Sequence, residues 1–400
     1  MKGRIFLFNK LNAKFRLSKF SKERSGVILI IVLWVLVILS ALAISLGRKT
    51  SIELALAKNA IGKVRAKFIS WAGVVYAINQ IYRDTQDSSS FKKDTFAYCG
   101  IKENPDVSLE DLFSHREVGS GFFEIVYNQY SDESEVMIEE IIIGNKYSGN
   151  RSVDIVNQQG PFMKRKSFYG FSDEERKINI NGITKKDYNI LSELILSFGY
   201  QEEKANIISA SIVDWTDGDD TITGGEKGAE NAYYEGLERP YRSKNTYFDV
   251  KEELLLVRGM TKEIYYAIED YVTVFPRGGS LQINFETATA PVLRALARAM
   301  AKAALAEEVE ADSLVEKLLA YRRGDDGAEQ TADDNIISFK EVATNAVERN
   351  IFLAMNRYRT KVSQFFNIHV AGVDRQSGAQ SAVEAIVARD DYTLVRWKRR

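Results

Sequence analysis

Gly26-Val27-Ile28-Leu29-Ile30-Ile31-Val32-Leu33-Trp34 opens an apolar run that continues without a charged residue to Leu46. Between positions 27 and 46 the only polar side chains are those of Ser40 and Ser45. Twenty helical residues rise about 30 Å, which is the thickness of the hydrocarbon core of a bilayer. We therefore predict a single transmembrane segment over residues 27–46.

The residues before this run are strongly basic. Residues 1–26 contain one acid, Glu23, and eight cationic side chains: Lys2, Arg4, Lys10, Lys14, Arg16, Lys19, Lys22 and Arg24. Basic flanks remain in the cytoplasm, so residues after Leu46 are expected on the outer side of the membrane. A cleavable secretory signal is the alternative, but it would have a shorter apolar run of about 7–15 residues.

Residues 47–84 continue the helix with amphipathic spacing. Apolar side chains recur about every 3.6 residues and proline is absent. They are Ile52, Leu54, Leu56, Ile61, Val64, Phe68, Ile69, Trp71, Val75, Tyr76 and Ile78. We predict one helix of about 50 residues or more, with its first half in lipid and its second half on a sheet. A membrane anchor that leads into an ordinary first domain helix remains the alternative.

The rest of the chain predicts an α+β fold. A loop is expected over 85–115, then a hairpin of strands 121–127 and 135–143 with a turn at 128–133, and a loop with a short strand over 144–176. Helices are expected at 188–196, 202–215, 250–257 and 262–271, from Pro291, and at 309–323 and 338–360. Two Ile-Asn strands, at 177–182 and 281–288, suggest that the helices between them leave and rejoin one sheet. Strands at 365–373, 382–388 and 392–397 end the chain.

Residues 253–264 have the pattern of a helix-hairpin-helix, with Gly259 at the tight turn. Such turns can bind DNA phosphate through backbone amides and flanking cations, here Arg258 and Lys262. Acidic side chains surround these cations, and without residues 1–26 the chain has 46 basic and 54 acidic residues. An acidic protein repels phosphate, so we expect no nucleic acid partner and a structural helical bundle. A membrane-anchored DNA-binding or DNA-uptake protein is kept as the alternative.

One loop, at 214–230, is rich in oxygen ligands. Four aspartates fall within seven residues, and glycines separate the polar positions. Hard cations with six to eight oxygen ligands, calcium above all, bind such loops. The candidate ligands are Asp214, Asp217, Asp219, Asp220, Thr223, Glu230 and Asn245. The spacing from Asp219 to Glu230 matches an EF-hand only in part, and a solvated acidic turn is the alternative.

Other chemistry finds little support in the sequence. His115 and His369 lie far apart without Cys or His neighbours, and Cys99 is the one cysteine, which argues against zinc and an intramolecular disulfide. The G-x-S-x-G, H-E-x-x-H and P-loop motifs of common enzyme classes are absent from the sequence. We therefore do not expect an enzyme.

The Gly26–Val27 junction and the order of the later motifs resemble one family, the minor pseudopilin K (general secretion pathway protein K) of type II secretion. The motifs are Asp214-Trp215, Gly228-Ala229-Glu230, Tyr233-Tyr234, Pro240-Tyr241-Arg242, Asn245, the run 253–260 and Ile283-Asn284-Phe285-Glu286-Thr287-Ala288. The resemblance covers roughly residues 24–300. Ile31 stands where pilins usually have Glu, and this family typically lacks that Glu.

The resemblance implies a type IV pilin-like fold with a large helical insert that binds calcium. It implies cleavage by prepilin peptidase after Gly26 and N-methylation of Val27. It also implies a single-pass protein of the inner membrane, with its bulk in the periplasm, at the tip of the pseudopilus beside minor pseudopilins I and J and the other pseudopilins. The expected division is a leader (1–26), a transmembrane segment (27–46), pilin-like helix and strands (47–182), a helical insert (183–275) and a return to the sheet with further helices (276–400).

Overall fold

The computed structural model describes residues 25–86, 109–131, 164–327 and 334–399, and the chain divides into two compact units at Ile61 and Gly62. Most of the predicted leader and the predicted strand 135–143 lie outside the described residues. Each unit is described by itself.

Within the first unit, the described residues belong to one helix, α1, which spans Ser25–Gln86 over the two units. Every large apolar side chain from Val27 to Leu46 is about half exposed or more. By length and composition this is the one helix of the described residues that could cross a membrane. The predicted long apolar helix is therefore confirmed, and side chains so exposed are suited to lipid rather than water.

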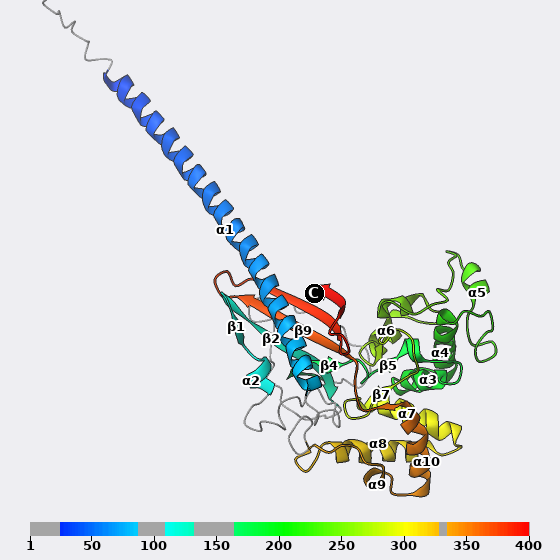
Figure 1. Cartoon of the computed structure of the whole chain (residues 1–400). Coiled ribbons are helices and arrows are strands. Elements are labelled where there is room, and N and C mark those ends of the chain that lie inside the picture. The colour runs from blue at the N-terminus through cyan, green and yellow to red at the C-terminus, as the bar shows by residue number, and fades with distance from the viewer. Residues whose placement is uncertain (1–24, 87–108, 132–163, 328–333, 400) are drawn as a thin grey trace, which may run out of the picture. The chain divides into compact units, whose positions relative to one another are not determined.

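The second unit begins with an antiparallel sheet that carries the last turns of α1 (Figure 1). Its strands follow the order β1-β2-β9-β10-β11, with β3 beside β2 and β4 beside β9. The bounds are β1 Arg116–Val118, β2 Gly121–Ser131, β3 Lys164–Tyr169, β4 Ser172–Asp173, β9 Phe365–Asp374, β10 Gln380–Ala388 and β11 Leu394–Arg399. A short helix, α2, spans Leu109–Phe113. The apolar face of α1 packs on this sheet and forms one hydrophobic core with it: Ile69, Val74, Ala77, Ile81, Phe123, Ile125, Phe366, Ile368 and Val370.

Contacts at its two ends fix the direction of α1 on the sheet. A Cβ atom on Gly62 would lie 1.9 Å from Ser377 Oγ, in the turn between β9 and β10. At the other end, Arg389, which follows β10, forms a buried ion pair with Asp84. Residues 62–86 therefore run from the β9–β10 turn to the opposite end of the sheet.

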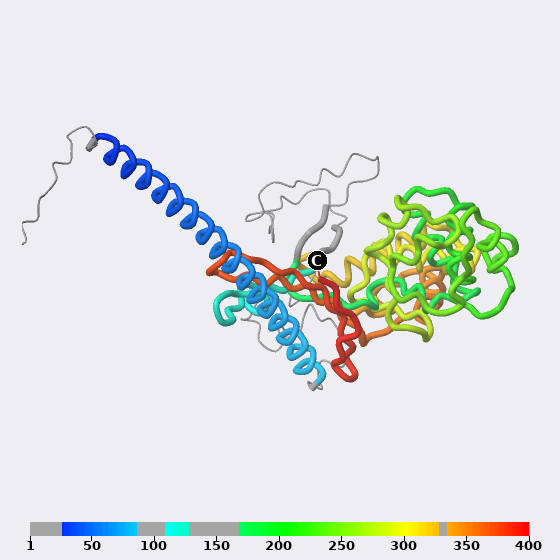
Figure 2. The backbone as a smooth tube through the Cα atoms, turned by 90° about the horizontal axis from the view of Figure 1, so that it is seen from above, coloured from blue at the N-terminus to red at the C-terminus, as the bar shows by residue number. Residues whose placement is uncertain are grey.

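The helical part joins the sheet at the end where α1 stops, as both views show (Figures 1 and 2). Its helices are α3 Tyr188–Ser197, α4 Glu202–Thr216, α5 Asn231–Glu235, α6 Lys262–Ile268, α7 Ala290–Ala303, α8 Glu308–Arg322, α9 Phe339–Val342 and α10 Ala346–Met355, with short 3-10 turns at Ile180–Gly182, Lys251–Leu256 and Asn356–Tyr358. Helix α3 packs on α4 and α7, and α7 packs on α8 and α10. One hydrophobic core connects all of them, separate from the core beneath α1.

The two Ile-Asn segments depart from the prediction because neither belongs to the seven-stranded sheet. Strand β5 (Ile178–Asn179) pairs in parallel with β6 (Val272–Thr273), and β7 (Ile283–Asn284) pairs in parallel with β8 (Arg359–Thr360). The side chains of the two asparagines instead donate hydrogen bonds to a backbone carbonyl and to a side-chain hydroxyl. Asn179 donates to the Pro276 carbonyl, and Asn284 donates to Ser363 Oγ. These short ladders brace the helical part where it meets the sheet.

Four further predictions differ from the structure. Strand β2 continues through Ser131, so the turn cannot start at 128, because these residues pair with β3. The expected helix at 250–257 is a 3-10 turn, and α2 lies within the expected loop 85–115. The expected helix at 338–360 is broken at Asn345, whose side chain accepts a hydrogen bond from the Glu348 amide and caps α10.

The close approach of α1 to β9 yields a test of the fold. A Cβ atom on Gly372 would lie 2.5 Å from the Ser70 nitrogen and 2.8 Å from the Ala66 carbonyl oxygen, both in the α1 backbone. Gly372→Ala should therefore destabilise the full chain by about 1–3 kcal/mol, because the helix must shift. Thermal unfolding in detergent, followed by circular dichroism, would measure this. Gly236→Ala is the matched control, since its Cβ meets only ordinary contacts of 3.5 Å; an equal Tm change in both variants would contradict the packing.

Candidate metal centre

The site begins at the C-terminal end of α4. Asp214 lies in the last turn of this helix and is fully buried, while Asp217 caps its end. The C-terminus of a helix carries partial negative charge, so carboxylates there are unfavourable without a nearby cation. The sequence still places both aspartates at this end, where a cation would offset the repulsion.

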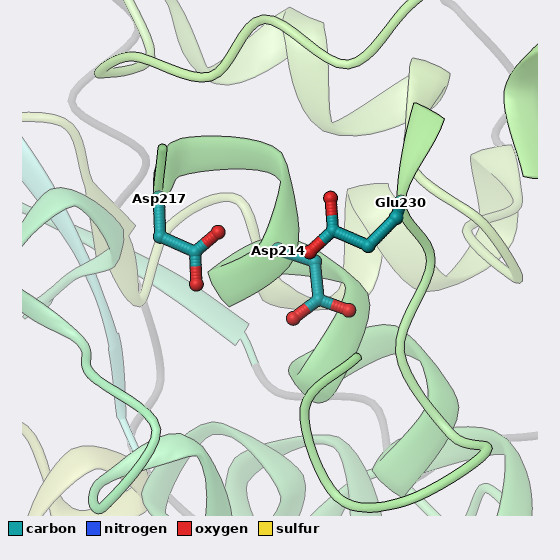
Figure 3. Close-up of side chains that lie close together, drawn as sticks. All are labelled: Asp214, Asp217 and Glu230. Atoms are coloured by element: carbon teal, nitrogen blue, oxygen red, sulfur yellow. The ribbon is translucent and has the colours of Figure 1, made fainter. Parts of the chain in front are cut away.

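The third carboxylate comes from the far side of the loop. Glu230 is the N-cap residue of α5, but its side chain makes no capping hydrogen bond and is directed toward Asp214 (Figure 3). Ligand oxygens of Asp214, Asp217 and Glu230 all lie within 4.8 Å of one another. The loop thus brings Glu230 close to Asp214, although the two are sixteen positions apart in the sequence.

Several oxygens of this cluster lack hydrogen-bond partners among the described residues. Both carboxylate oxygens of Glu230 are buried in this state, as are Asp217 Oδ1 and Thr223 Oγ1. Asp214 accepts from the Thr223 amide, at 3.0 and 3.2 Å for its two oxygens. Buried polar atoms are normally paired, so these unpaired oxygens fit the coordination of a cation. An all-oxygen donor set suits calcium and lacks the nitrogen or sulfur ligands typical of zinc.

The pKa values of the three carboxylates also favour a bound cation. Burial raises the pKa of Asp214 and of Asp217 above their usual values. Burial, and then the neighbouring Asp214 and Asp217 charges, raise the pKa of Glu230 to about 7. Three carboxylates this close resist full ionisation by themselves, and a divalent cation would favour the ionised form.

A glycine of the loop and an arginine outside it hold the loop in place. A Cβ atom on Gly228 would lie 1.9 Å from Asp214 Oδ2, so a larger residue here would displace the Asp214 carboxylate. Arg258 donates to the carbonyl oxygens of Gly228 at 2.8 Å and Glu226 at 3.3 Å, and its guanidinium lies over the Tyr233 ring. The density of glycines was visible in the sequence, whereas the contact with Arg258, thirty residues away, was not.

Three of the four remaining predicted ligands are exposed, unlike the buried Asp214 and Glu230. Asp219 is exposed and both its oxygens accept from Lys185 Nζ at 2.8 Å, which holds the pKa of Asp219 below its usual value. Lys185 Nζ is also 3.2 Å from Asp217 Oδ2. Asp220 and Asn245 are exposed, and the Asn245 side-chain oxygen accepts from Ser243. Thr223 alone of these four is buried beside the cluster.

The helix-hairpin-helix turn is committed to internal contacts. Gly259 has a φ of +81°, and a Cβ atom there would lie 3.1 Å from Ile208. The amide of Met260 donates to the Val257 carbonyl, and the amide of Arg258 donates to Tyr234 Oη. The turn therefore packs on α4 and supports the acidic loop.

Comparison with known proteins matches this same region. The family model for type II secretion system protein K matches residues 176–277, which include the acidic loop. Protein K of Aeromonas hydrophila is 34% identical over 94 residues, 24% of this chain and 28% of the relative. Over this region the chain is similar to type II secretion system protein K. The protein K relative from Pectobacterium carotovorum is 32% identical over 106 residues, 26% of this chain and 31% of that protein. These matches span less than a third of the relatives' length.

A solved structure extends the likeness in fold beyond that region. A chain in the crystal structure of the GspK-GspI-GspJ complex from enterotoxigenic Escherichia coli aligns with a TM-score of 0.50 and 13% identity. The alignment covers 85% of this chain and 99% of that chain. The predicted fold, a long N-terminal helix on an antiparallel sheet with a helical insert, is therefore confirmed.

Whether the three-carboxylate cluster binds calcium can be tested by removing one carboxylate at a time. Asp214→Asn or Glu230→Gln should lower the calcium affinity by about tenfold or more, because each removes a charged ligand of the cluster. Titration calorimetry of the purified full chain in detergent would measure it. Asp220→Asn, which changes an exposed aspartate of the same loop, is the matched control and should leave the affinity within about twofold. Equal losses in all three variants would contradict the assigned ligands.

The raised pKa of Glu230 gives a pH dependence. Between pH 4.5 and about 7 the folded chain holds a proton that the unfolded chain has released, so this group's contribution to stability falls as pH rises. Without calcium, we expect a higher Tm at pH 5.5 than at pH 7.5. Glu175, whose pKa burial raises to about 8, acts in the same direction, so the wild type is compared with Glu230→Gln.

The Glu230→Gln variant should show a smaller fall in Tm between these two pH values, because glutamine does not titrate. Scanning calorimetry in a chelating buffer would measure the difference. Excess calcium should also reduce the fall in the wild type. A variant with an unchanged pH dependence would show that Glu230 titrates normally.

Proposed function

We propose that this chain is a minor pseudopilin that ends the type II secretion pseudopilus at its tip. One observation carries this: the helical part lies at the end of the sheet where α1 stops, at the opposite end from Gly62. In a filament of pilin-like subunits the helices run along the axis. A helical part beyond the end of α1 therefore takes up the space that a further subunit would need.

The N-terminal sequence supports the same position. Ile31 is the fifth residue after Gly26, where a carboxylate would pair with the N-terminal amine of a neighbouring subunit. A subunit with none above it has no amine to pair with, so an apolar residue is tolerated there. In this proposal the leader is cut after Gly26 by prepilin peptidase, and Val27 becomes the methylated N-terminus.

The proposal includes location, partners and a bound ion. The N-terminus lies in the cytoplasm, residues 27–46 cross the inner membrane, and the sheet and helical part are in the periplasm. The partners are minor pseudopilins I and J, as in the complex named for the related structure, together with the other pseudopilins. Calcium at Asp214, Asp217 and Glu230 neutralises the cluster and stabilises the loop. The role is structural, in assembling the filament for protein export.

The DNA-binding alternative gains no support from the geometry. Binding of phosphate by the hairpin turn would need its amides and the Arg258 guanidinium. Arg258 already donates to two carbonyls of the acidic loop, and its own amide donates to Tyr234. The acidic loop beside it would repel phosphate.

The leader junction gives the most accessible test. Mass spectrometry of the membrane-bound protein should find N-methyl-valine at position 27 when prepilin peptidase is present, and an uncut chain when it is absent. Gly26→Val should block cleavage, while Gly47→Val should not. A Cβ atom on either glycine meets nothing within 4 Å, so neither change disturbs the fold. An uncut chain in the presence of the peptidase would remove the pseudopilin proposal.

A further inference from the structure

The turn between α7 and α8 has an unusual residue at its centre. Helix α7 ends at Ala303, with Ala304 as its C-cap, and Leu305 follows with a φ of +55°. The Ala306 amide donates to the Ala301 carbonyl at 2.9 Å, and the Leu305 amide donates to the Lys302 carbonyl at 3.2 Å. This left-handed position after a helix is usually glycine, because a side chain is strained there.

The side chain of Leu305 gains nothing from the fold in return for this strain. It is 97% exposed, which makes it the most exposed large hydrophobic residue of the described chain. Ala303 and Ala304 beside it are exposed, and Val309 at the start of α8 is 73% exposed. Both the backbone preference and the hydrophobic effect favour another residue at 305. Positions that break local rules without a structural return are expected at functional sites.

The surroundings of this apolar turn are acidic. Glu307 and Glu308 are exposed directly after it, and Glu310 follows one turn of α8 later. The neighbouring cation, Lys302, is 2.6 Å from Glu193 and 3.5 Å from Glu308, so it is already paired. An apolar tip with an acidic border complements an apolar pocket with a basic rim. The same acids would be repelled by an anionic membrane surface.

We propose that the α7–α8 turn is a docking knob, in which Leu305 enters an apolar pocket on a periplasmic protein whose rim carries Lys or Arg side chains. This inference rests on the proposed function, since the partner is met at the end of the pseudopilus that carries the helical part. Burial of the leucine in the complex supplies the free energy that the isolated chain lacks.

The knob makes stability and function change in opposite directions. Leu305→Gly relieves the strained backbone, so the full chain in detergent should show a Tm higher by about 1–4 °C. In cells where this variant is the sole copy, the amount of type II substrate in the medium should fall at least tenfold. Loss of secretion together with a more stable fold cannot be attributed to misfolding.

Controls separate the knob from the proposed function. Leu353→Ala, at another exposed leucine on α10, should secrete normally. Deletion of the gene should abolish secretion; if it does not, the proposed function fails. If deletion abolishes secretion and Leu305→Gly secretes within twofold of wild type, the knob is overturned while the proposed function stands.

The charge of the border is tested by the double substitution Glu307→Lys, Glu308→Lys. It should lower secretion at least fivefold, because it places cations against the basic rim. Normal secretion by this double variant would overturn the proposed chemistry of the partner.

Discussion

The rest of this structure depends on one helix, α1, whose first half is suited to lipid and whose second half packs on a sheet. From Val27 to Leu46 the α1 side chains are exposed and apolar, which suits lipid. From Ile69 to Ile81 the helix instead buries one face on the sheet. Gly372 lets its backbone approach β9, and the buried pair of Asp84 with Arg389 closes its end. An unpaired charge there would be costly, so the pair holds the end of α1 against the end of β10.

The acidic loop of the helical part also contains buried charges that need a partner. Asp214, Asp217 and Glu230 are held together by a close glycine, a helix end and the Arg258 contacts, none of which neutralises them fully. A bound cation would convert this repulsion into cross-linking of α4, the loop and α5. The helix-hairpin-helix turn, a motif that can bind nucleic acid, here contacts that loop through Arg258. An ion bound at this cluster would in this way also stiffen the helical part.

Much of this could be predicted from the sequence where the signal is local. The apolar run, the amphipathic helix and the acidic loop depend on neighbouring residues, and all three were predicted with the correct type. What failed depends on distant partners. The Ile-Asn segments look like strands of one sheet, but their pairing is decided by residues about 75–95 positions away. Likewise, Lys185 pairs with Asp219 through a contact that spacing cannot reveal. The fold class was accessible from pattern, whereas the contacts of individual side chains in the acidic loop were not.

The central claim is that this chain ends the filament, and labelling of assembled pseudopili tests it most directly. Tyr266 is an exposed residue of the helical part, so Tyr266→Cys in a Cys99→Ser background accepts one gold label per chain. Electron microscopy of pseudopili that contain this variant should show a single label at one end of each filament. Labels spaced along the filament would contradict the account, since the helical part would then leave room for a subunit above it.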